Sequence, residues 1–505
     1  MNGIGTATVG TRQQHTLVGS VLGHARLAPG ATALVWRGGE VGYGELLARA
    51  ERERARIRDL PSDSPLAVPA TKSPATIALV LACLLERRPL LLPSSTLGAD
   101  VRERLYEQAG VRHVLTPDNL PQPQPQPQPH VPAPEPVAPA RPDSAALLLT
   151  TSGSTGLPKT VPLTAAALDR FTAWAGEAFG IGPGTTVLNY APLNFDLCLL
   201  DVWATLAHGG RVVLVDPDHA AKGAHLVDLI ARYEVEIVQS VPMFYRLLTD
   251  AAQAEGRMLP SVRHALSTGD TLPAPVRAAL PGVLPGARLY NLYGCTETND
   301  SFLYEMTGAE PADRPLPLGR PLPGVSALLV TADGGVLDGP GTGELYVRTP
   351  FQSEGYAGAA AASGAFVPHP EGADGQCWFR SGDLVRRAAD GTLTLSGRTD
   401  FQVKIRGVRI NPQEVEHVLL EHPGVTEAAV VALPDAVAGR LLHAVARRTP
   451  GSALNSLSLR GHLARGLPRA AIPSALRVTD EPLPRTSTGK VDRDRVVRDH
   501  FTKEN

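Results

Sequence analysis

The pattern that most constrains the fold is an alternation of strand and helix signals between residues 145 and 241. Strand-like apolar runs stand at Ala145–Thr150, Arg211–Val215 and Glu236–Val241, and helical periodicity stands at Ala165–Phe179 and Leu226–Ala231. Strands that alternate with helices imply a mostly parallel sheet with helices on both faces. We therefore predict the α/β fold class, with a large N-terminal domain of mostly parallel sheets flanked by helices.

Two other regions differ from this pattern. Residues 116–143 form a Pro/Gln-rich tract that has no means of packing a core, and we expect a solvated loop without a function of its own. From about Pro315 to Arg348 the pattern turns β-rich with glycine turns, which predicts a β-rich subdomain.

The tail of the chain has the size of a separate domain. Apolar residues alternate in VKIRGVRI, helical signals cover Pro412–Leu420 and begin again at Asp492, and a strand signal lies between them at Ala428–Ala432. Roughly a hundred residues suffice for a small α+β domain. We therefore divide the chain into residues 1–399 and a C-terminal domain of residues 400–505.

Charge and cysteine content exclude several classes of function. The chain has 48 Lys and Arg against 50 Asp and Glu, and this balance argues against nucleic acid or an anionic membrane as a partner. The four cysteines form no CxxC pair, which fits a reducing compartment, and the longest apolar run, Ile77–Leu85, is too short to span a bilayer. The first residues show no secretory signal, so we expect a cytoplasmic protein.

A loop rich in glycine and hydroxyl residues follows the strand predicted at 145–150. In LLLTTSGSTGLPKT, backbone N–H groups and hydroxyls could wrap an anionic oxygen cluster, with Lys159 as the counter-charge. Only six of the basic residues are lysine, so a lysine in this chain indicates a need for a compact charge on a flexible stem. The candidate phosphate-binding residues are Thr151, Ser152, Gly153, Ser154, Thr155, Gly156 and Lys159.

This string resembles the signature of adenylate-forming enzymes, the superfamily of acyl-CoA synthetases, luciferases and peptide-synthetase adenylation domains. Five further strings resemble the core motifs of that superfamily, in the expected order: NFDLCLLDVW (Asn194–Trp203), NLYGCTETND (Asn291–Asp300), FRSGDL (Phe379–Leu384), GRTDFQVKIRGVRI (Gly397–Ile410) and PRTSTGK (Pro484–Lys490). Chance agreement on all six is negligible. The resemblance implies a mobile C-terminal domain that carries a catalytic lysine.

The resemblance also implies a reaction in which a carboxylate attacks the α-phosphorus of ATP. Two anions must approach, so the site needs positive charge and fixed placement of both reactants. By the family match, Lys490 would bridge the substrate carboxylate and the adenylate oxygens. Glu297 would hold Mg²⁺ through oxygen ligation, and Thr296 would donate to the α-phosphate.

The nucleoside would be held by residues of three motifs. Tyr293 offers a face for adenine and Asn291 an amide for its edge, while Gly269 leaves room for the flat purine. Asp383 would accept from both ribose hydroxyls, and Arg398 would lie near the ribose.

A second half-reaction would transfer the acyl group to a thiol. In the family, the C-terminal domain turns about a hinge that matches Asp400 and replaces the Lys490 face by one that carries Lys404 and Gly407. The chain contains neither a carrier-type GGxS serine string nor an HHxxxDG condensation string. We therefore expect a separate carrier protein with a phosphopantetheine thiol as partner, in nonribosomal peptide or antibiotic biosynthesis.

Asp196 favours an amino acid as the substrate. It stands where amino-acid-activating members place the carboxylate that pairs with the substrate ammonium. The surrounding FDL-x-x-x-D resembles prolyl- and D-alanyl-carrier-protein ligases. The pocket lining that follows from the alignment is Asp196, Leu197, Leu200, Ser240, Leu266, Thr268, Leu292, Asp300, Ser301 and Lys490.

Asp300 is the most informative departure from the prolyl type. A second carboxylate in a small pocket is costly unless the ligand or the protein brings a donor or a cation. Either the substrate is a small polar, basic, β- or proline-like amino acid that Asp300 and Ser301 bind, or Asp300 faces an arginine or water outside the pocket.

Two other functions remain open from the sequence. A carboxylate:CoA ligase or amide synthetase of the same superfamily would not need Asp196. A non-catalytic nucleotide-binding regulator would lack Lys490 or Glu297, and both are present.

Overall fold

The computed structural model describes residues 16–117, 145–151, 158–311, 314–358, 364–372, 375–399, 403–435, 438–484 and 491–502. Several predicted features lie outside these residues: most of the Pro/Gln tract, residues 152–156 of the phosphate loop, the hinge residue Asp400 and Lys490.

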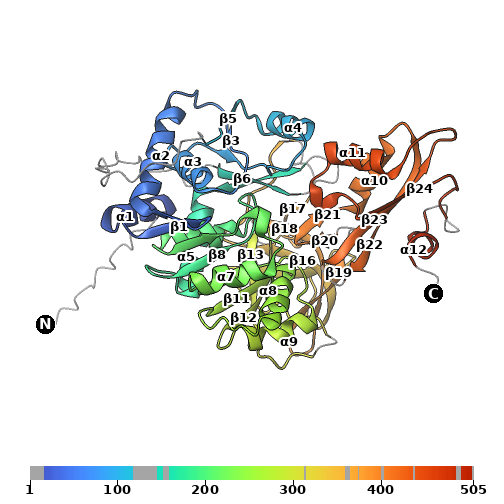
Figure 1. Ribbon diagram of the computed structural model, residues 1–505. Helices are drawn as coiled ribbons and strands as arrows, with labels where there is room; N and C mark the ends of the chain where they lie inside the picture. The colour runs from blue at the N-terminus through green and yellow to red at the C-terminus, as the bar shows by residue number, and fades with distance from the viewer. Residues whose placement is uncertain are drawn as a thin grey trace.

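A nine-stranded sheet forms the centre of the large N-terminal domain (Figure 1), in the order β14-β13-β12-β11-β10-β8-β9-β1-β2. Its strands are β1 (Thr32–Trp36), β2 (Gly39–Gly42), β8 (Thr186–Asn189), β9 (Arg211–Leu214), β10 (Ile237–Ser240), β11 (His264–Thr268), β12 (Arg288–Cys295), β13 (Asn299–Glu305) and β14 (Arg320–Pro321). The six strands from β12 to β1 run parallel, and the outer strands are antiparallel. This confirms the predicted, mostly parallel sheet.

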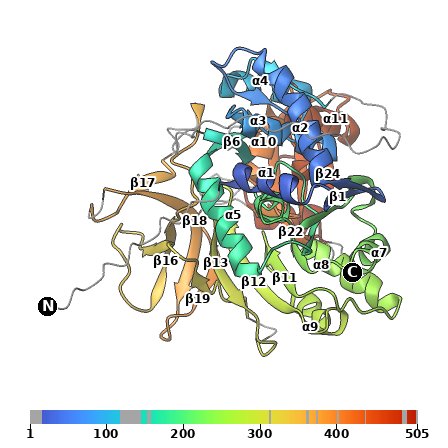
Figure 2. The same cartoon turned by 90° about the vertical axis from the view of Figure 1, so that its left-hand side faces the viewer.

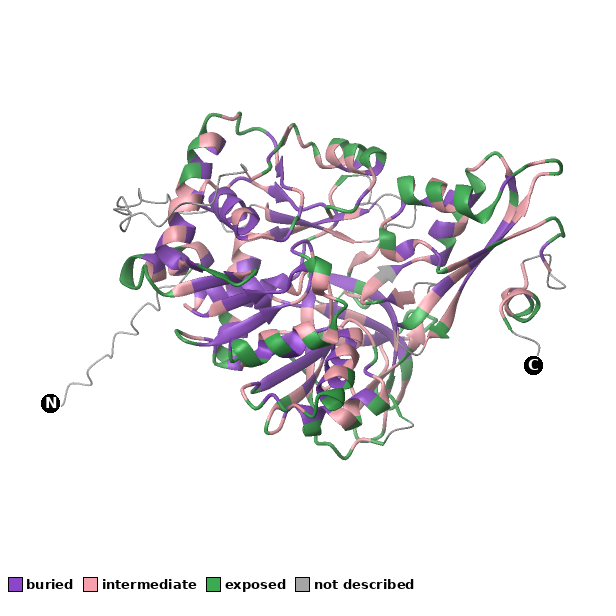
Figure 3. Ribbon diagram, in the orientation of Figure 1, coloured by how far each residue is buried: buried purple, intermediate pink, exposed green. Residues whose placement is uncertain are grey.

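A second sheet and the helices complete the core. The sheet has the order β5-β3-β4-β6-β7, with β3 (Leu66–Ala67), β4 (Leu90–Leu91), β5 (His113–Val114), β6 (Ala145–Thr151) and β7 (Lys159–Thr164). The helices are α1 (Leu17–Leu27), α2 (Tyr43–Arg58), α3 (Pro74–Leu85), α4 (Ala99–Ala109), α5 (Ala165–Phe179), α6 (Thr205–Ala207), α7 (Gly223–Arg232), α8 (Pro242–Ala254) and α9 (Ala274–Val283). Buried residues run along the strands of both sheets (Figure 3).

Helix α3 shows how the sequence sets one of these elements. Ser73 caps it by accepting from the Thr76 backbone N–H, and Pro74 occupies its first turn, where a missing N–H costs nothing. Eleven of its twelve residues are buried. A helix that is apolar all round must lie inside the protein, and α3 packs in the largest core cluster.

The predicted β-rich subdomain is an antiparallel sheet that stands on one side of the large domain (Figure 2). It is built from β15 (Ser326–Val330), β16 (Gly341–Arg348), β17 (Phe366–Pro368), β18 (Cys377–Arg387) and β19 (Leu393–Arg398). It therefore extends fifty residues beyond the Pro315–Arg348 segment in which the sequence signals it.

The smaller C-terminal domain has its own core and lies beside the large domain (Figure 1). Its elements are β20 (Val403–Ile405), β21 (Val408–Ile410), α10 (Pro412–Leu420), β22 (Val425–Asp435), β23 (Gly439–Arg448), α11 (Ser456–Gly466), β24 (Ala475–Thr479) and α12 (Arg493–His500). Across the described ranges, we find no helix with the length and apolar character that a membrane span requires.

Candidate active site

The candidate site lies where the parallel strands of the large sheet end. β12 and β11 are neighbours, and β10 lies between β11 and β8. The segments that follow β8, β11 and β12 carry Asp196, Gly269 and Glu297, respectively. Open α/β sheets bind ligands outside the carboxyl ends of their strands. Three motifs that are far apart in the sequence therefore meet at one edge.

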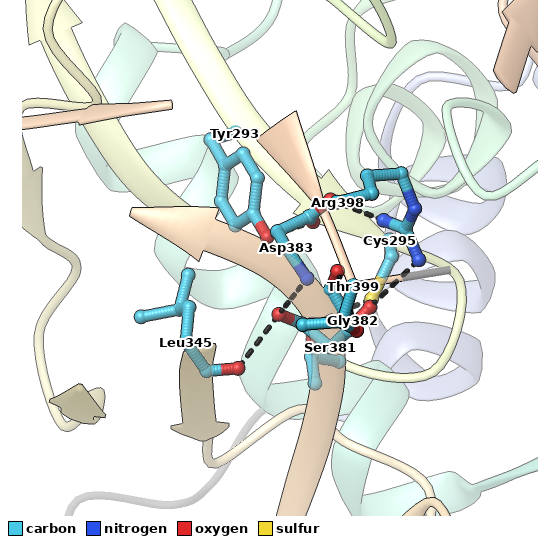
Figure 4. Close-up of polar contacts among 9 residues, drawn as sticks. Tyr293, Cys295, Leu345, Ser381, Gly382, Asp383, Arg398 and Thr399 are labelled. Carbon is cyan, nitrogen blue, oxygen red and sulfur yellow. Dashed lines mark hydrogen bonds and ion pairs between the residues drawn. The ribbon is translucent and has the colours of Figure 1, made fainter. Parts of the chain in front are cut away.

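Asp383 is held by two groups at the border between the large sheet and the β-rich subdomain (Figure 4). Tyr293 on β12 donates its hydroxyl to Asp383 Oδ2 at 2.5 Å, and Arg398 on β19 forms an ion pair with Asp383 Oδ1. Arg398 also donates to the Ser381 carbonyl at 3.0 Å. A carboxylate has about four acceptor positions, so this fixed group keeps capacity for hydroxyl donors such as those of ribose.

Tyr293 lies deeper than a stacking face requires. Its side chain is buried, its ring packs edge-on against Phe302, and burial raises the pKa of its hydroxyl well above the ordinary value. Asn291 donates its amide to the Pro317 carbonyl at 2.8 Å, which leaves the amide oxygen as its acceptor. In the described structure both side chains therefore make hydrogen bonds within the protein at the predicted nucleotide site, Tyr293 with Asp383 and Asn291 with the Pro317 carbonyl.

Glu297 forms the acidic part of the site. It is 2% exposed, and Tyr356 donates its hydroxyl to Glu297 Oε1 at 2.6 Å. Lys159 Nζ lies 4.7 Å from the centre of the Tyr356 ring. The fixed carboxylate fits Mg²⁺, which prefers oxygen ligands, and the lysine fits the phosphates with which Mg²⁺ usually shares a site.

Thr151 stands where the phosphate loop begins. It pairs with Lys159 across β6 and β7. Its hydroxyl oxygen is buried and has no hydrogen-bond partner in the described part of the chain. A buried hydroxyl without a partner is costly. The Thr151 hydroxyl is therefore suited to donate to a phosphate oxygen.

Asp196 lies next to the nucleotide motif and to the C-terminal domain. Burial raises its pKa, a hydrogen bond from Thr296 opposes this, and the Glu297 carboxylate raises it again. Lys404 on β20 is close enough to lower the pKa of Asp196. The candidate amine-binding group therefore adjoins the residues predicted to hold ATP.

The four leucines predicted to line the pocket lie together in the core. Leu200, Leu266 and Leu292 belong to one buried cluster, against which Leu197 packs. Thr268 ends β11 and is 5% exposed.

The two predicted pocket serines differ in their hydroxyl contacts. Ser240 ends β10 with a buried hydroxyl that has no partner among the described residues. The Ser301 hydroxyl instead contacts the Asn299 carbonyl and the Thr298 hydroxyl, so it is engaged by residues at the start of β13 and directly before it.

The β20–β21 hairpin closes one side of the site. Gly407 at its tip lies against Val241 and the backbone at Gly269, where φ is +84° and a side chain would be strained. A small pocket at this junction is lined by, among others, Arg246, Asp270, Arg406 and Gly407. Two arginines and one aspartate thus line this small pocket beside the hairpin.

Sequence reasoning missed several residues of the site. Tyr356 and Glu414 carry no motif signal of their own. Asp201 lies in a π-helix, η1 (Leu199–Ala204), and accepts from Asn189 at 3.2 Å. Lys72 is 6% exposed and donates to the Asn189 and Tyr190 carbonyls. The scarcity of lysine was a signal that could have found it.

Comparisons with known proteins agree with this geometry. The AMP-binding enzyme family matches residues 23–357, and the AMP-binding enzyme C-terminal domain matches residues 414–490. An L-proline--[L-prolyl-carrier protein] ligase of Pseudomonas fluorescens is 34% identical over 401 residues, 78% of each chain. A D-alanine--D-alanyl carrier protein ligase of Bacillus licheniformis is 29% identical over 95% of this chain and 98% of its own.

The solved structures that resemble this chain include a nonribosomal peptide synthetase protein with adenylation and PCP domains, bound to a vinylsulfonamide inhibitor. It superposes with a TM-score of 0.80 at 27% identity and covers 96% of this chain and 84% of its own. Since the family match spans more than half of the sequence, the chain belongs to the AMP-binding enzymes.

Proposed function

We propose that this chain adenylates an amino acid and loads it onto a separate carrier protein. In the first step the substrate carboxylate attacks the α-phosphorus of ATP, and pyrophosphate leaves. In the second step the phosphopantetheine thiol of the carrier attacks the acyl carbon, and AMP leaves. The relatives named as prolyl- and D-alanyl-carrier protein ligases support this reaction class.

One observation carries the choice of an amino acid over other acids. Asp196 is a partly buried carboxylate that lies against Thr296 and Glu297, beside the candidate nucleotide site. A buried carboxylate needs a charged partner, and the ammonium of an amino acid supplies one. A fatty or aryl acid would leave Asp196 without it, so a carboxylate:CoA ligase or amide synthetase is the weaker alternative.

The geometry of the nucleotide site supports the roles that the motifs imply for its residues. Asp383 would accept from the ribose hydroxyls, Thr151 and Lys159 would contact phosphate oxygens, and Glu297 would hold Mg²⁺. The metal, when bound, would offset negative charge on the phosphates. Lys490 belongs to the same proposal through its motif alone.

The transfer step would use the C-terminal domain, proposed to begin at residue 400. Lys404 and Gly407 lie on the hairpin beside Asp196 and Gly269. Arg246 and Arg406, which line the small pocket at this junction, are suitable contacts for the phosphate of a thiol arm. None of the four cysteines forms a disulfide, which supports a cytoplasmic location.

Amino-acid-dependent exchange of pyrophosphate with ATP tests the first step, and mass spectrometry of a carrier protein tests the second. We expect exchange with at least one amino acid and not with fatty or aryl acids. Asp196→Ala should lower kcat/KM for the amino acid roughly 100-fold, because an ammonium would lose its ion pair in a buried site. Exchange that is supported by aryl or fatty acids alone would overturn the proposal.

A further inference from the structure

A β-bulge sets the direction of the Asp300 side chain. β12 and β13 pair Leu292 with Leu303 and Tyr293 with Phe302, and the register then shifts so that Gly294 opposes Asp300. Ser301 is the extra residue at this shift. Bulges of this kind re-aim side chains and are common next to active sites.

The register places Asp300 on the pocket side of the sheet. Tyr293 and Phe302 face the β-rich subdomain and share its core, whereas Leu292 belongs to the cluster of Leu200 and Leu266. Side chains alternate along a strand, so Gly294 follows Leu292 on the pocket face. Directly opposed residues share a face, so Asp300 lies there as well.

Glycine at position 294 lets the backbone of β13 approach β12 closely at the bulge. A Cβ at Gly294 would lie 2.4 Å from the Asn299 carbonyl oxygen and 2.8 Å from Asp300 Cα. The glycine therefore permits the close pairing at the bulge, and the register of that pairing sets the face on which Asp300 lies.

Asp300 has no counter-ion in the described structure. Its carboxylate has no hydrogen-bond or ion-pair partner among the residues described. Burial raises its pKa well above the ordinary value, and the nearby Asp196 carboxylate raises it further. No described cation offsets either effect, although Asp196 itself has Lys404 nearby.

We propose that Asp300 selects an amino acid that carries a second protonated nitrogen in its side chain. The α-ammonium would pair with Asp196 and the second nitrogen with Asp300. This inference rests on the proposed function, since it assigns the substrate of that same site. A diamino acid, or a proline that bears an amino group, has the required chemistry.

A second cation fits better than a hydroxyl because two like charges face the same space. Asp196 has Lys404 nearby, whereas no described cation acts on Asp300, so the α-ammonium alone would leave the Asp300 carboxylate without a cation of its own. A hydroxyl donates one neutral hydrogen bond and leaves that charge in place. Charge-assisted pairs are roughly twice as strong as neutral ones.

Pyrophosphate exchange with matched substrates tests this proposal. Diaminopropionate, diaminobutyrate, ornithine and aminoproline are each compared with the hydroxyl and methyl counterparts of the same length. We expect one amino-bearing member to exceed its methyl counterpart in kcat/KM by roughly 10- to 100-fold. Asp300→Asn should bring that ratio close to one, and Asp300→Val should favour the methyl compound.

Controls separate the possible failures. Asp228→Asn removes an exposed carboxylate on α7 that pairs with Arg257, and it should leave the ratio unchanged. Preference of the wild type for a hydroxyl or methyl compound would overturn the inference. An equal loss with every amino acid in Asp300→Asn would overturn it too, because Asp300 would then serve a general partner such as Lys490.

Ligand-induced shifts in Tm, with ATP present, report binding without turnover. If no amino acid supports exchange but a diamino acid still raises the Tm of the wild type and not of Asp300→Asn, the proposed reaction fails and the inference stands. If neither exchange nor a shift occurs, both are refuted.

Discussion

Glu414 is a buried acid whose removal should change how stability depends on pH. It lies in the first turn of α10, is 4% exposed, and its Oε2 has no hydrogen-bond partner in the described chain. Burial raises its pKa from 4.5 to about 8, although the charge of Lys159 on the large domain lowers it. At neutral pH the folded chain therefore keeps a proton that the unfolded chain releases.

The sign and size of the effect follow from linkage. Because the folded pKa is the higher one, the free energy of unfolding is greatest below pH 4.5, falls as the pH rises towards about 8, and is level above that. With one pKa unit worth about 1.4 kcal/mol, the unfavourable contribution is about 2 kcal/mol at pH 6 and about 4 kcal/mol at pH 8. Glu414→Gln keeps the shape and removes the titration.

Urea unfolding that is monitored by hydrogen exchange of the α10 amides measures the free energy of unfolding locally at each pH. The stability gain of Glu414→Gln over the wild type should grow by about 2 kcal/mol between pH 6 and pH 8. Glu421→Gln, at the exposed end of the same helix, is the matched control and should show no such growth. Parallel pH profiles for Glu414→Gln and the wild type would refute the reasoning.

Three further predictions concern the two half-reactions and the bulge. Asp383→Asn should raise the KM for ATP roughly 10-fold or more in pyrophosphate exchange, because the ribose hydroxyls lose a charged acceptor; an unchanged KM would contradict the ribose assignment. Lys490→Ala should lower the exchange rate at least about 100-fold, whereas Lys404→Ala should spare exchange and slow carrier loading; equal effects on both steps would contradict the division of roles. Gly294→Ala should cost about 1–3 kcal/mol in urea unfolding and reduce discrimination between amino and methyl substrates, because its Cβ would overlap the Asn299 carbonyl; a variant as stable as the wild type would contradict this account of the hairpin.

Long periodic elements were predictable from the sequence, and short or irregular ones were not. Helices α5 and α10 have the bounds that periodicity predicted, Ala165–Phe179 and Pro412–Leu420. The strands β17 to β19 escaped prediction although β17 and β19 pair with β18, their neighbour in the chain; β17, with three residues, is too short to show a clear alternation. The π-helix η1 escaped because one extra residue per turn leaves no clear trace in a six-residue segment.

The site shows the same division between motif and geometry. The strings around Glu297 and Asp383 carried their own signal, and the structure joins them through the hydrogen bond from Tyr293 on β12 to Asp383 on β18. Whether Asp300 faced the pocket could not be read from spacing, because a shift of one residue reverses the face of a strand. Tyr356, which binds Glu297 from 59 positions away, depends on tertiary folding alone.

The shifted pairing of β12 and β13 also limits how this enzyme can be re-engineered. The contact proposed between Asp300 and the substrate depends on the register shift in the backbone. An aspartate introduced at the same position of a relative with regular pairing would therefore point towards the other side of the sheet. The smallest transferable module is the whole hairpin from Gly294 to Ser301. Chimeras that exchange this hairpin should transmit substrate preference where single-residue grafts do not.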